Sequence, residues 1–264
     1  MTGVVNKDAV TLIIPCLNEA SVIATTVSHY HALGYKNVLV LDDSSTDETA
    51  VVARQSKARV ITNQAINGYT TTALRGLYNV KTDYALLTDP TNEFTEMQLE
   101  SFLEFGVLGN YGILFTKWTE DSQSPISTVA KHLKEKFGIF IDDPDYELVF
   151  INSKIIEASK TEPTVTEKFF FFSLITFAIN SKQKIGTFNI NSQRYFGNGK
   201  WRRVSRRLRT KRINKLHDDY FHYTFPDFEK KKFNNQLIVA ICGALVGGVV
   251  TFLAQYALSL SSNS

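Results

Sequence analysis

The sequence predicts an α/β fold in which helices cover both faces of a mostly parallel sheet, followed by one C-terminal transmembrane helix. Two observations lead to this fold class. Short apolar runs typical of buried strands alternate with helical periodicity through the first hundred residues, and such alternation builds parallel β-α-β units. Residues 237–260 then form a run of 24 positions without a charged side chain, which is long enough to cross a bilayer as a helix.

Four strands and three helices are expected in the first hundred residues. Each strand is a short run of apolar and β-branched residues, and each helix repeats apolar side chains three or four positions apart. The strands are expected at residues 10–14, 38–41, 59–62 and 84–88. The helices are expected at residues 22–30, from 46 or 47 to about 55, and at residues 68–79.

Polar side chains follow three of these strands, at the point where each strand ends. Carboxyl ends of parallel strands meet at one edge of a sheet, and ligands bind in the crevice beyond that edge. The residues in question are Pro15, Asn18, Glu19, Asp42, Asp43 and Asp89. Each of them could instead serve a turn or cap a helix, but together they predict a pocket.

The middle of the chain is less regular. A helix with a basic face is expected at residues 126–137, and strands are expected at residues 147–151 and 185–190. The run Phe169–Phe172 fits either a helix or a strand, because periodicity alone does not separate short apolar segments.

The composition is that of an ordinary globular protein. The 264 residues carry a net charge of +3, and 44% of them are hydrophobic, which excludes disordered, collagen-like and disulfide-scaffold classes. The two cysteines, Cys16 and Cys242, are too few and too far apart for a cysteine-based zinc site. We therefore expect a reducing, cytosol-facing location, and the N-terminus shows no signal peptide.

The uncharged run at residues 237–260 is interpreted as a single membrane anchor. Buried core helices are the alternative, but they are usually shorter and amphipathic. Lys230–Lys232 precede the run, and positive residues stay on the cytoplasmic side, so the body of the protein is expected to face the cytoplasm. Gly243 and Gly247 have the spacing that lets membrane helices self-associate, although small residues are common in such helices.

A basic segment precedes the anchor. Ten Lys and Arg residues lie between Arg194 and Lys215 without an intervening acid. Trp201, Val204 and Leu208 share one face of a helix within this segment, a pattern typical of helices on anionic membranes. A nucleic-acid patch and a solvated face are the alternatives. The neighbouring anchor favours lipid headgroups or a lipid phosphate, and we expect no nucleic-acid partner.

Four segments resemble family 2 glycosyltransferases in order and spacing: Ile13–Glu19, Val40–Asp47, Gly68–Gly76 and Tyr84–Asp89. The resemblance implies a GT-A fold, in which a Rossmann-like nucleotide-binding half joins an acceptor half. The anchor and the basic segment make the polyprenyl-phosphate sugar transferases, such as dolichyl-phosphate mannose synthases, the most similar subgroup. The expected boundaries are 1–225 for the transferase domain (1–100 nucleotide half, 101–225 acceptor half), 226–236 for a linker and 237–260 for the anchor.

The resemblance also implies roles for individual residues of the nucleotide half. It implies a donor-binding set made of Pro15, Leu17, Glu19, Asp42, Asp43 and Gly68, to which Arg202 of the basic segment is added. It further implies Mg²⁺ or Mn²⁺, held by the Asp-x-Asp strand end. Here that motif reads Asp89-Pro-Thr91, and Glu93 follows two residues later, so Asp89, Thr91 and Glu93 are the candidate ligands. Alternatively, Glu93 begins a solvated helix and the metal is bound weakly or not at all.

The predicted catalytic residues are Asp89, Lys117, Arg194 and Lys200. Arg194–Lys200 resembles the family's Arg-x-x-Gly-x-Ser-Lys loop, which closes over the phosphates, with Gly199 in place of serine. Lys117 stands where the family often has an arginine after its next strand.

We therefore expect a membrane-anchored, inverting enzyme that moves a sugar from a GDP- or UDP-sugar to a polyprenyl phosphate. An ionised lipid phosphate needs no general base to attack the sugar. Two alternatives stay open: transfer to a hydroxyl of a glycan, lipid or protein, which needs a carboxylate base, and a degenerate, non-catalytic partner subunit. The incomplete Asp-x-Asp motif and the missing Ser-Gly-Phe after residue 144 motivate the latter.

Overall fold

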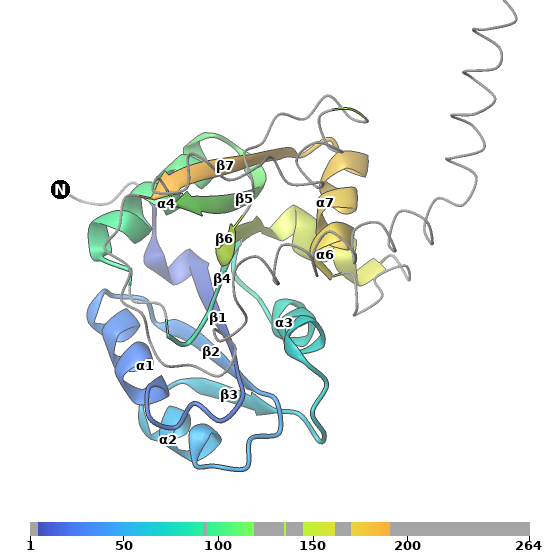
Figure 1. Ribbon diagram of the computed structural model, residues 1–264. Coiled ribbons are helices and arrows are strands. Elements are labelled where there is room, and N and C mark those ends of the chain that lie inside the picture. The colour runs from blue at the N-terminus through green and yellow to red at the C-terminus, as the bar shows by residue number, and fades with distance from the viewer. Residues whose placement is uncertain (1–4, 92–93, 119–134, 136–144, 162–169, 191–264) are drawn as a thin grey trace, which may run out of the picture. The chain divides into compact units, whose positions relative to one another are not determined.

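The computed structural model describes residues 5–91, 94–118, 145–161 and 170–190, together with residue 135 (Figure 1). Several predicted segments lie outside these ranges: most of the helix at 126–137, the basic segment, the linker at 226–236 and the membrane anchor at 237–260. No helix in the described ranges combines the length and the apolar character that a membrane span requires.

In the described part of the chain, seven strands form one sheet in the order β3-β2-β1-β4-β6-β5-β7. Their bounds are Val10–Cys16 (β1), Asn37–Asp42 (β2), Arg59–Thr62 (β3), Tyr84–Thr88 (β4), Tyr111–Trp118 (β5), Asp145–Asn152 (β6) and Lys184–Ile190 (β7). β6 runs antiparallel to both of its neighbours, and every other pair is parallel. The predicted mostly parallel sheet is therefore confirmed.

Helices cover both faces of this sheet, as expected (Figure 1). Their bounds are Ile23–Ala32 (α1), Thr49–Gln55 (α2), Tyr69–Tyr78 (α3), Glu96–Leu108 (α4), Ser153–Thr161 (α6) and Phe170–Asn180 (α7). α1, α2 and α4 bury apolar side chains in one core with β1 and β2, whereas α3, α6 and α7 pack together on the opposite face. Gly76 lets α3 approach the sheet, because a Cβ there would lie 2.6 Å from Ile13 Cγ2.

The structure settles the open assignments. Phe170–Phe172 belong to helix α7, since the mostly apolar segment continues to Ile179 and is too long for a typical strand. α4 begins at Glu96, where Thr95 and Gln98 form a capping box. A solvated helix starting at Glu93 was therefore wrong, because α4 starts later and buries Leu99 and Phe102.

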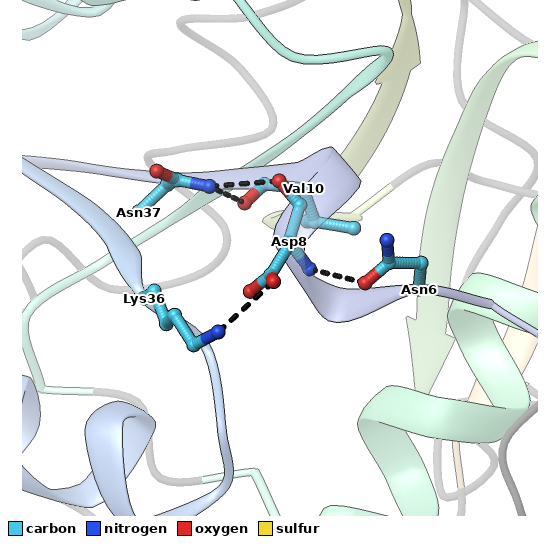
Figure 2. A network of polar contacts seen from close by, with 5 residues as sticks. All are labelled: Asn6, Asp8, Val10, Lys36 and Asn37. Carbon is cyan, nitrogen blue, oxygen red and sulfur yellow. Dashed lines mark hydrogen bonds and ion pairs between the residues drawn. The ribbon is translucent and has the colours of Figure 1, made fainter.

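Hydrogen bonds and an ion pair connect the amino-terminal ends of β1 and β2 (Figure 2). The predicted pocket lies at the opposite, carboxyl-terminal ends of these strands. Asn37 Nδ2 donates to the carbonyl of Asp8 at 2.9 Å and to that of Val10 at 3.5 Å. Lys36 forms an ion pair with Asp8 at 2.9 Å, which is exposed and adds little stability by itself. These contacts join the first residues of β1 and β2, which pair in parallel from Thr11 and Asn37 onward.

Candidate functional site

Four loops follow the carboxyl ends of β1, β2, β3 and β4, and they hold most of the predicted site residues. The loops after β1 and β2 are joined by side-chain to backbone hydrogen bonds. The backbone N–H of Asn18 donates to Ser45 Oγ at 2.9 Å, and the side-chain Oδ1 of Asn18 accepts from the backbone N–H of Thr46 at 2.8 Å. The Glu19 N–H donates to Thr49 Oγ1 at 2.8 Å. The two loops therefore form one hydrogen-bonded unit.

Asp47 forms an Asx turn just before α2 and also binds the first loop. Its Oδ1 accepts from the Thr49 N–H at 3.0 Å and from the Thr49 hydroxyl, and its Oδ2 accepts from the Ala20 N–H at 3.3 Å. Burial alone would raise the pKa of Asp47, but the Thr49 and Ala20 hydrogen bonds outweigh burial and lower this pKa. α2 itself begins at Thr49 with Glu48 as its N-cap, one or two residues later than the predicted cap at Thr46 or Asp47.

The predicted donor-binding residues Pro15, Leu17, Glu19 and Asp42 lie along the first two of these loops and the strand ends before them. Glu19 and Asp42 are buried, and Asp42 Oδ1 accepts from the Ser45 N–H at 3.2 Å. Cys16 lies among these groups. Burial, together with the negative charges of Asp42 and Glu19, raises the pKa of the Cys16 thiol, so this thiol is not a nucleophile at neutral pH.

The side chain of Asp43 accepts hydrogen bonds from the loop after β3. Its Oδ1 accepts from Asn63 Nδ2 at 2.7 Å and from the Asn67 N–H at 2.9 Å, and its Oδ2 accepts from the Gly68 N–H at 2.8 Å. Burial raises the pKa of Asp43, but these bonds and the Thr72 hydroxyl outweigh it and lower the pKa below the ordinary aspartate value. Gly68 has φ of +89° at the start of α3, a conformation that favours glycine.

Asn63 and Arg75 are site residues that the sequence analysis did not name. Asn63 Nδ2 also donates to Thr72 Oγ1 at 2.9 Å, and its Oδ1 accepts from Arg75 Nη1. Arg75 Nη1 donates to the Thr62 carbonyl at 3.1 Å. The rule that found the other strand-end residues could have found Asn63, because it directly follows β3. These bonds connect β2, β3 and α3 around the Asp43 carboxylate.

Asp89 lies at the end of β4, partly exposed between buried neighbours. The Thr91 N–H and hydroxyl both donate to Asp89 Oδ1, at 2.8 and 2.6 Å, which forms an Asx turn. Pro90 and Thr91 are buried. Thr91 thus orients Asp89 in the structure, and its role as a metal ligand stays a prediction. Glu93 lies outside the described residues.

The donor set of this loop fits a divalent cation. Within the described ranges, no cluster of three or more His, Cys, Asp or Glu side chains could enclose a metal ion. Mg²⁺ and Mn²⁺ prefer oxygen ligands, and Mg²⁺ is commonly held by one or two carboxylates together with substrate phosphates. Asp89 matches a site of this kind, in which the protein supplies one carboxylate and the substrate phosphates supply further oxygens. Its Oδ1 takes part in the Asx turn, and its Oδ2 lies outside that turn.

Lys117 is the other predicted catalytic residue whose backbone the structure describes. It lies near the end of β5, where it pairs with Asn189 of β7. β5 runs in the same direction as β4, because each is antiparallel to β6, so Lys117 lies at the same sheet edge as Asp89. Arg194, Lys200 and Arg202 lie outside the described residues.

Residues 11–228 match the family model described as glycosyl transferase family 2. The chain belongs to glycosyl transferase family 2. The expectation of a glycosyltransferase is thereby confirmed at the level of the family.

Curated relatives of this family 2 protein match it over short segments only. The glycosyltransferase AglJ of Haloferax volcanii is 44% identical over 54 residues, which are 20% of this chain and 18% of AglJ. An uncharacterized protein of Methanocaldococcus jannaschii is 32% identical over 74 residues, which are 27% of this chain and 30% of that protein. The chain thus spans less than a third of the length of either relative.

Solved structures share the fold over about four fifths of this chain. Glucosyl-3-phosphoglycerate synthase of Mycobacterium tuberculosis superposes with a TM-score of 0.60 at 15% identity, covering 80% of both chains. The same enzyme in complex with Mg²⁺ and uridine diphosphate superposes with a TM-score of 0.56 at 17% identity, covering 78% of both chains. These similarities confirm the expected GT-A-like α/β fold, and at this identity they show the fold alone.

Proposed function

We propose that this family 2 protein transfers a sugar from a nucleotide sugar to a polyprenyl phosphate at a membrane, with a divalent metal at Asp89. One observation carries the donor half of this proposal. The oriented carboxylate of Asp89 lies at the same sheet edge as the hydrogen-bonded loops after β1 and β2. A nucleotide sugar needs such an arrangement, because its nucleoside and its diphosphate must be held together.

The nucleoside is proposed to bind beside Glu19 and Asp42, with Pro15, Leu17 and Gly68 completing the pocket. Base N–H groups and ribose hydroxyls are hydrogen-bond donors, which carboxylates can accept. The loop after β3 is fixed at the same edge through Asp43. Asp43 is proposed to line this pocket while it fixes the loop after β3, because its oxygens accept bonds from that loop.

The diphosphate is proposed to bind near Asp89, with Glu93 as a further oxygen ligand. The Mycobacterium tuberculosis enzyme has been solved with Mn²⁺, uridine diphosphate and phosphoglyceric acid, which supports a metal for this fold. A divalent ion held there would stabilise the charge that develops on the departing diphosphate. Lys117, Arg194, Lys200 and Arg202 are proposed to supply the remaining positive charge.

In the proposed reaction, a phosphate oxygen of the acceptor forms a bond to the anomeric carbon of the sugar. The bond from that carbon to the diphosphate breaks, and its electron pair leaves with the nucleoside diphosphate. Direct displacement inverts the anomeric carbon. Asp43 and Asp47 have lowered pKa values, which makes both of them poor general bases. An acceptor that is already ionised, such as a lipid phosphate, needs no general base for this step.

The membrane part of the proposal rests on the sequence. The uncharged run at residues 237–260 would anchor the protein, and Lys230–Lys232 would keep the catalytic domain on the cytoplasmic side. The basic segment at residues 194–215 would bind anionic headgroups or the acceptor phosphate. Gly243 and Gly247 are proposed to support self-association of the anchor.

The test uses the full chain purified in detergent and supplied with Mn²⁺. Radiolabelled GDP- and UDP-sugars are incubated in turn with a polyprenyl phosphate, the corresponding polyprenol and 3-phosphoglycerate. We expect a lipid-linked sugar that mild acid releases, formed from the polyprenyl phosphate only. Transfer to the polyprenol or to 3-phosphoglycerate would replace the lipid-phosphate acceptor with a hydroxyl acceptor. Failure with every donor would favour the non-catalytic partner subunit.

A further inference from the structure

We infer that Thr26 and His29 of α1 are positioning residues that orient the Asp89 loop and so couple metal binding to nucleotide binding. The inference rests on the proposed function, because it concerns how the proposed metal site is held. α1 connects the loop after β1, where the nucleoside is proposed to bind, with the loop after β4, where the metal is proposed to bind. It begins directly after the loop that contains Glu19, and it contacts the loop after β4 through these two side chains.

Thr26 holds the first residue after Asp89. Its hydroxyl lies 2.5 Å from the Pro90 carbonyl oxygen and 3.1 Å from the Val22 carbonyl oxygen. A hydroxyl has one proton, and the Val22 carbonyl already accepts from the Thr26 N–H. Donation to Pro90 is therefore the contact that the Thr26 hydroxyl adds. Thr26 is only 3% exposed, and a buried hydroxyl inside a helix needs such a partner.

The Pro90 carbonyl and the Thr91 N–H belong to one peptide group. A peptide group is planar, so fixing its oxygen also fixes the direction of its N–H. That N–H donates to Asp89 Oδ1 at 2.8 Å. Thr26 thus orients the Asp89 carboxylate through two hydrogen bonds and one rigid plane.

His29 holds the far side of the same loop. Its Nε2 lies 2.8 Å from the carbonyl oxygen of Phe94, which can only accept, so Nε2 carries the proton. His29 follows Thr26 by three positions, which places both side chains on one face of α1. Phe94 itself is buried, with 2% of its side chain exposed. The Asp89 loop is therefore held at Pro90 and again at Phe94.

The amino-terminal end of α1 is fixed to the nucleoside side of the site. The carbonyl of Glu19 accepts from the N–H groups of Val22 and Ile23, both at 3.0 Å. A nucleotide that orders the loop around Glu19 would therefore act on the same helix that holds the Asp89 loop. If nucleotide binding at Glu19 changes the metal affinity at Asp89 through α1, metal binding changes the nucleotide affinity by the same factor.

Two pairs of variants test the inference in the full chain. Thr26→Val removes the hydroxyl at nearly constant shape, and Thr26→Ser keeps it. His29→Leu removes the donor, and His29→Gln keeps an amide N–H at similar reach. For each variant, Mn²⁺ affinity is measured by electron paramagnetic resonance with UDP or GDP present. Nucleotide affinity without metal and the melting temperature are measured alongside.

We expect Thr26→Val and His29→Leu to weaken Mn²⁺ binding by ~10-fold, the usual scale for partners that orient a metal ligand. Nucleotide affinity without metal should stay within about twofold of wild type, and Thr26→Ser and His29→Gln should bind Mn²⁺ as wild type does. If both Thr26→Val and His29→Leu keep wild-type Mn²⁺ affinity, the positioning role is wrong. The same holds if their melting temperatures fall while their Mn²⁺ affinities stay unchanged. A wild-type protein that binds no Mn²⁺ with either nucleotide would instead overturn the proposed function, and the inference with it.

Discussion

The backbone N–H of Gly68 donates a hydrogen bond to Asp43 Oδ2 at 2.8 Å, so the end of β2 directly holds the start of α3. The residues are 25 positions apart in the chain. Gly68 stands in the left-handed region with φ of +89°, where a side chain would be strained. One ionised carboxylate thereby sets the shape of a loop at the candidate nucleoside pocket.

Asp43→Asn should destabilise the protein by about 1–3 kcal/mol at pH 7, because backbone donors of the β3–α3 loop lose a charged acceptor. The pKa of Asp43 is lower in the folded protein than its ordinary value. Its stabilising effect is therefore complete above the unfolded pKa of about 3.9 and is lost as the pH falls through the folded pKa. Urea unfolding of both proteins from pH 7 to pH 3 would show the difference shrinking. A difference that does not depend on pH would contradict an ionised Asp43.

Asp89→Ala should reduce sugar transfer at least ~100-fold while leaving the fold intact, because it removes the carboxylate proposed to bind the metal and hence to stabilise the diphosphate. Transfer assays and circular dichroism measure the two effects. Asn63→Ala serves as a comparison at the same sheet edge. It should weaken nucleotide binding and stability, but it should not change the Mn²⁺ requirement. Wild-type turnover in Asp89→Ala would refute the assignment of this residue.

Thr91→Asp should increase the dependence on Mn²⁺. The Thr91 hydroxyl lies 2.6 Å from Asp89 Oδ1, so a carboxylate there would place two negative charges in contact. Such a pair is unfavourable without a cation and favourable with one. We expect a lower melting temperature in the absence of metal and a larger increase when Mn²⁺ is added. An unchanged response to Mn²⁺ would mean that this loop does not hold the ion.

Gly76→Ala should destabilise the fold by about 1–3 kcal/mol, as expected for overpacking. The added Cβ would lie 2.6 Å from Ile13 Cγ2 and 2.9 Å from Leu41 Cδ2, so α3 would have to move away from β1 and β2. Thr70→Ala, on the same helix but partly exposed, is the control and should change the free energy of unfolding by less than about 0.5 kcal/mol. Chemical denaturation measures both variants.

Removing residues 233–264 should release a soluble domain that still binds nucleotide, because the nucleotide half is expected within the first hundred residues and every candidate donor-binding residue precedes residue 233. Transfer to a long-chain lipid phosphate should fall much more than nucleotide binding, since the acceptor partitions into the membrane. Transfer assays with vesicles that contain the lipid phosphate, and nucleotide titration, measure the two properties. Equal loss of both would show that the removed segment belongs to the catalytic fold.

Local patterns in the sequence were sufficient to predict the strands and helices of the first hundred residues and the edge of the sheet where polar residues gather. Apolar runs and helical periodicity reflect burial of single elements, so they can be recognised without knowing the neighbours. This is why Asp89, Asp42 and Glu19 could be assigned to one edge. The same approach did not find the antiparallel direction of β6, because strand order and direction depend on contacts between distant segments.

The sequence by itself thus determined the family, the α/β class and the candidate carboxylates of this protein. Only the tertiary structure decided what each carboxylate contacts. Asp43 binds a loop 20 to 25 residues away, and Thr26 reaches Pro90 across 64 positions. Hydrogen bonds of this kind have no periodicity in the chain, since they form only after the sheet has brought its strand ends together.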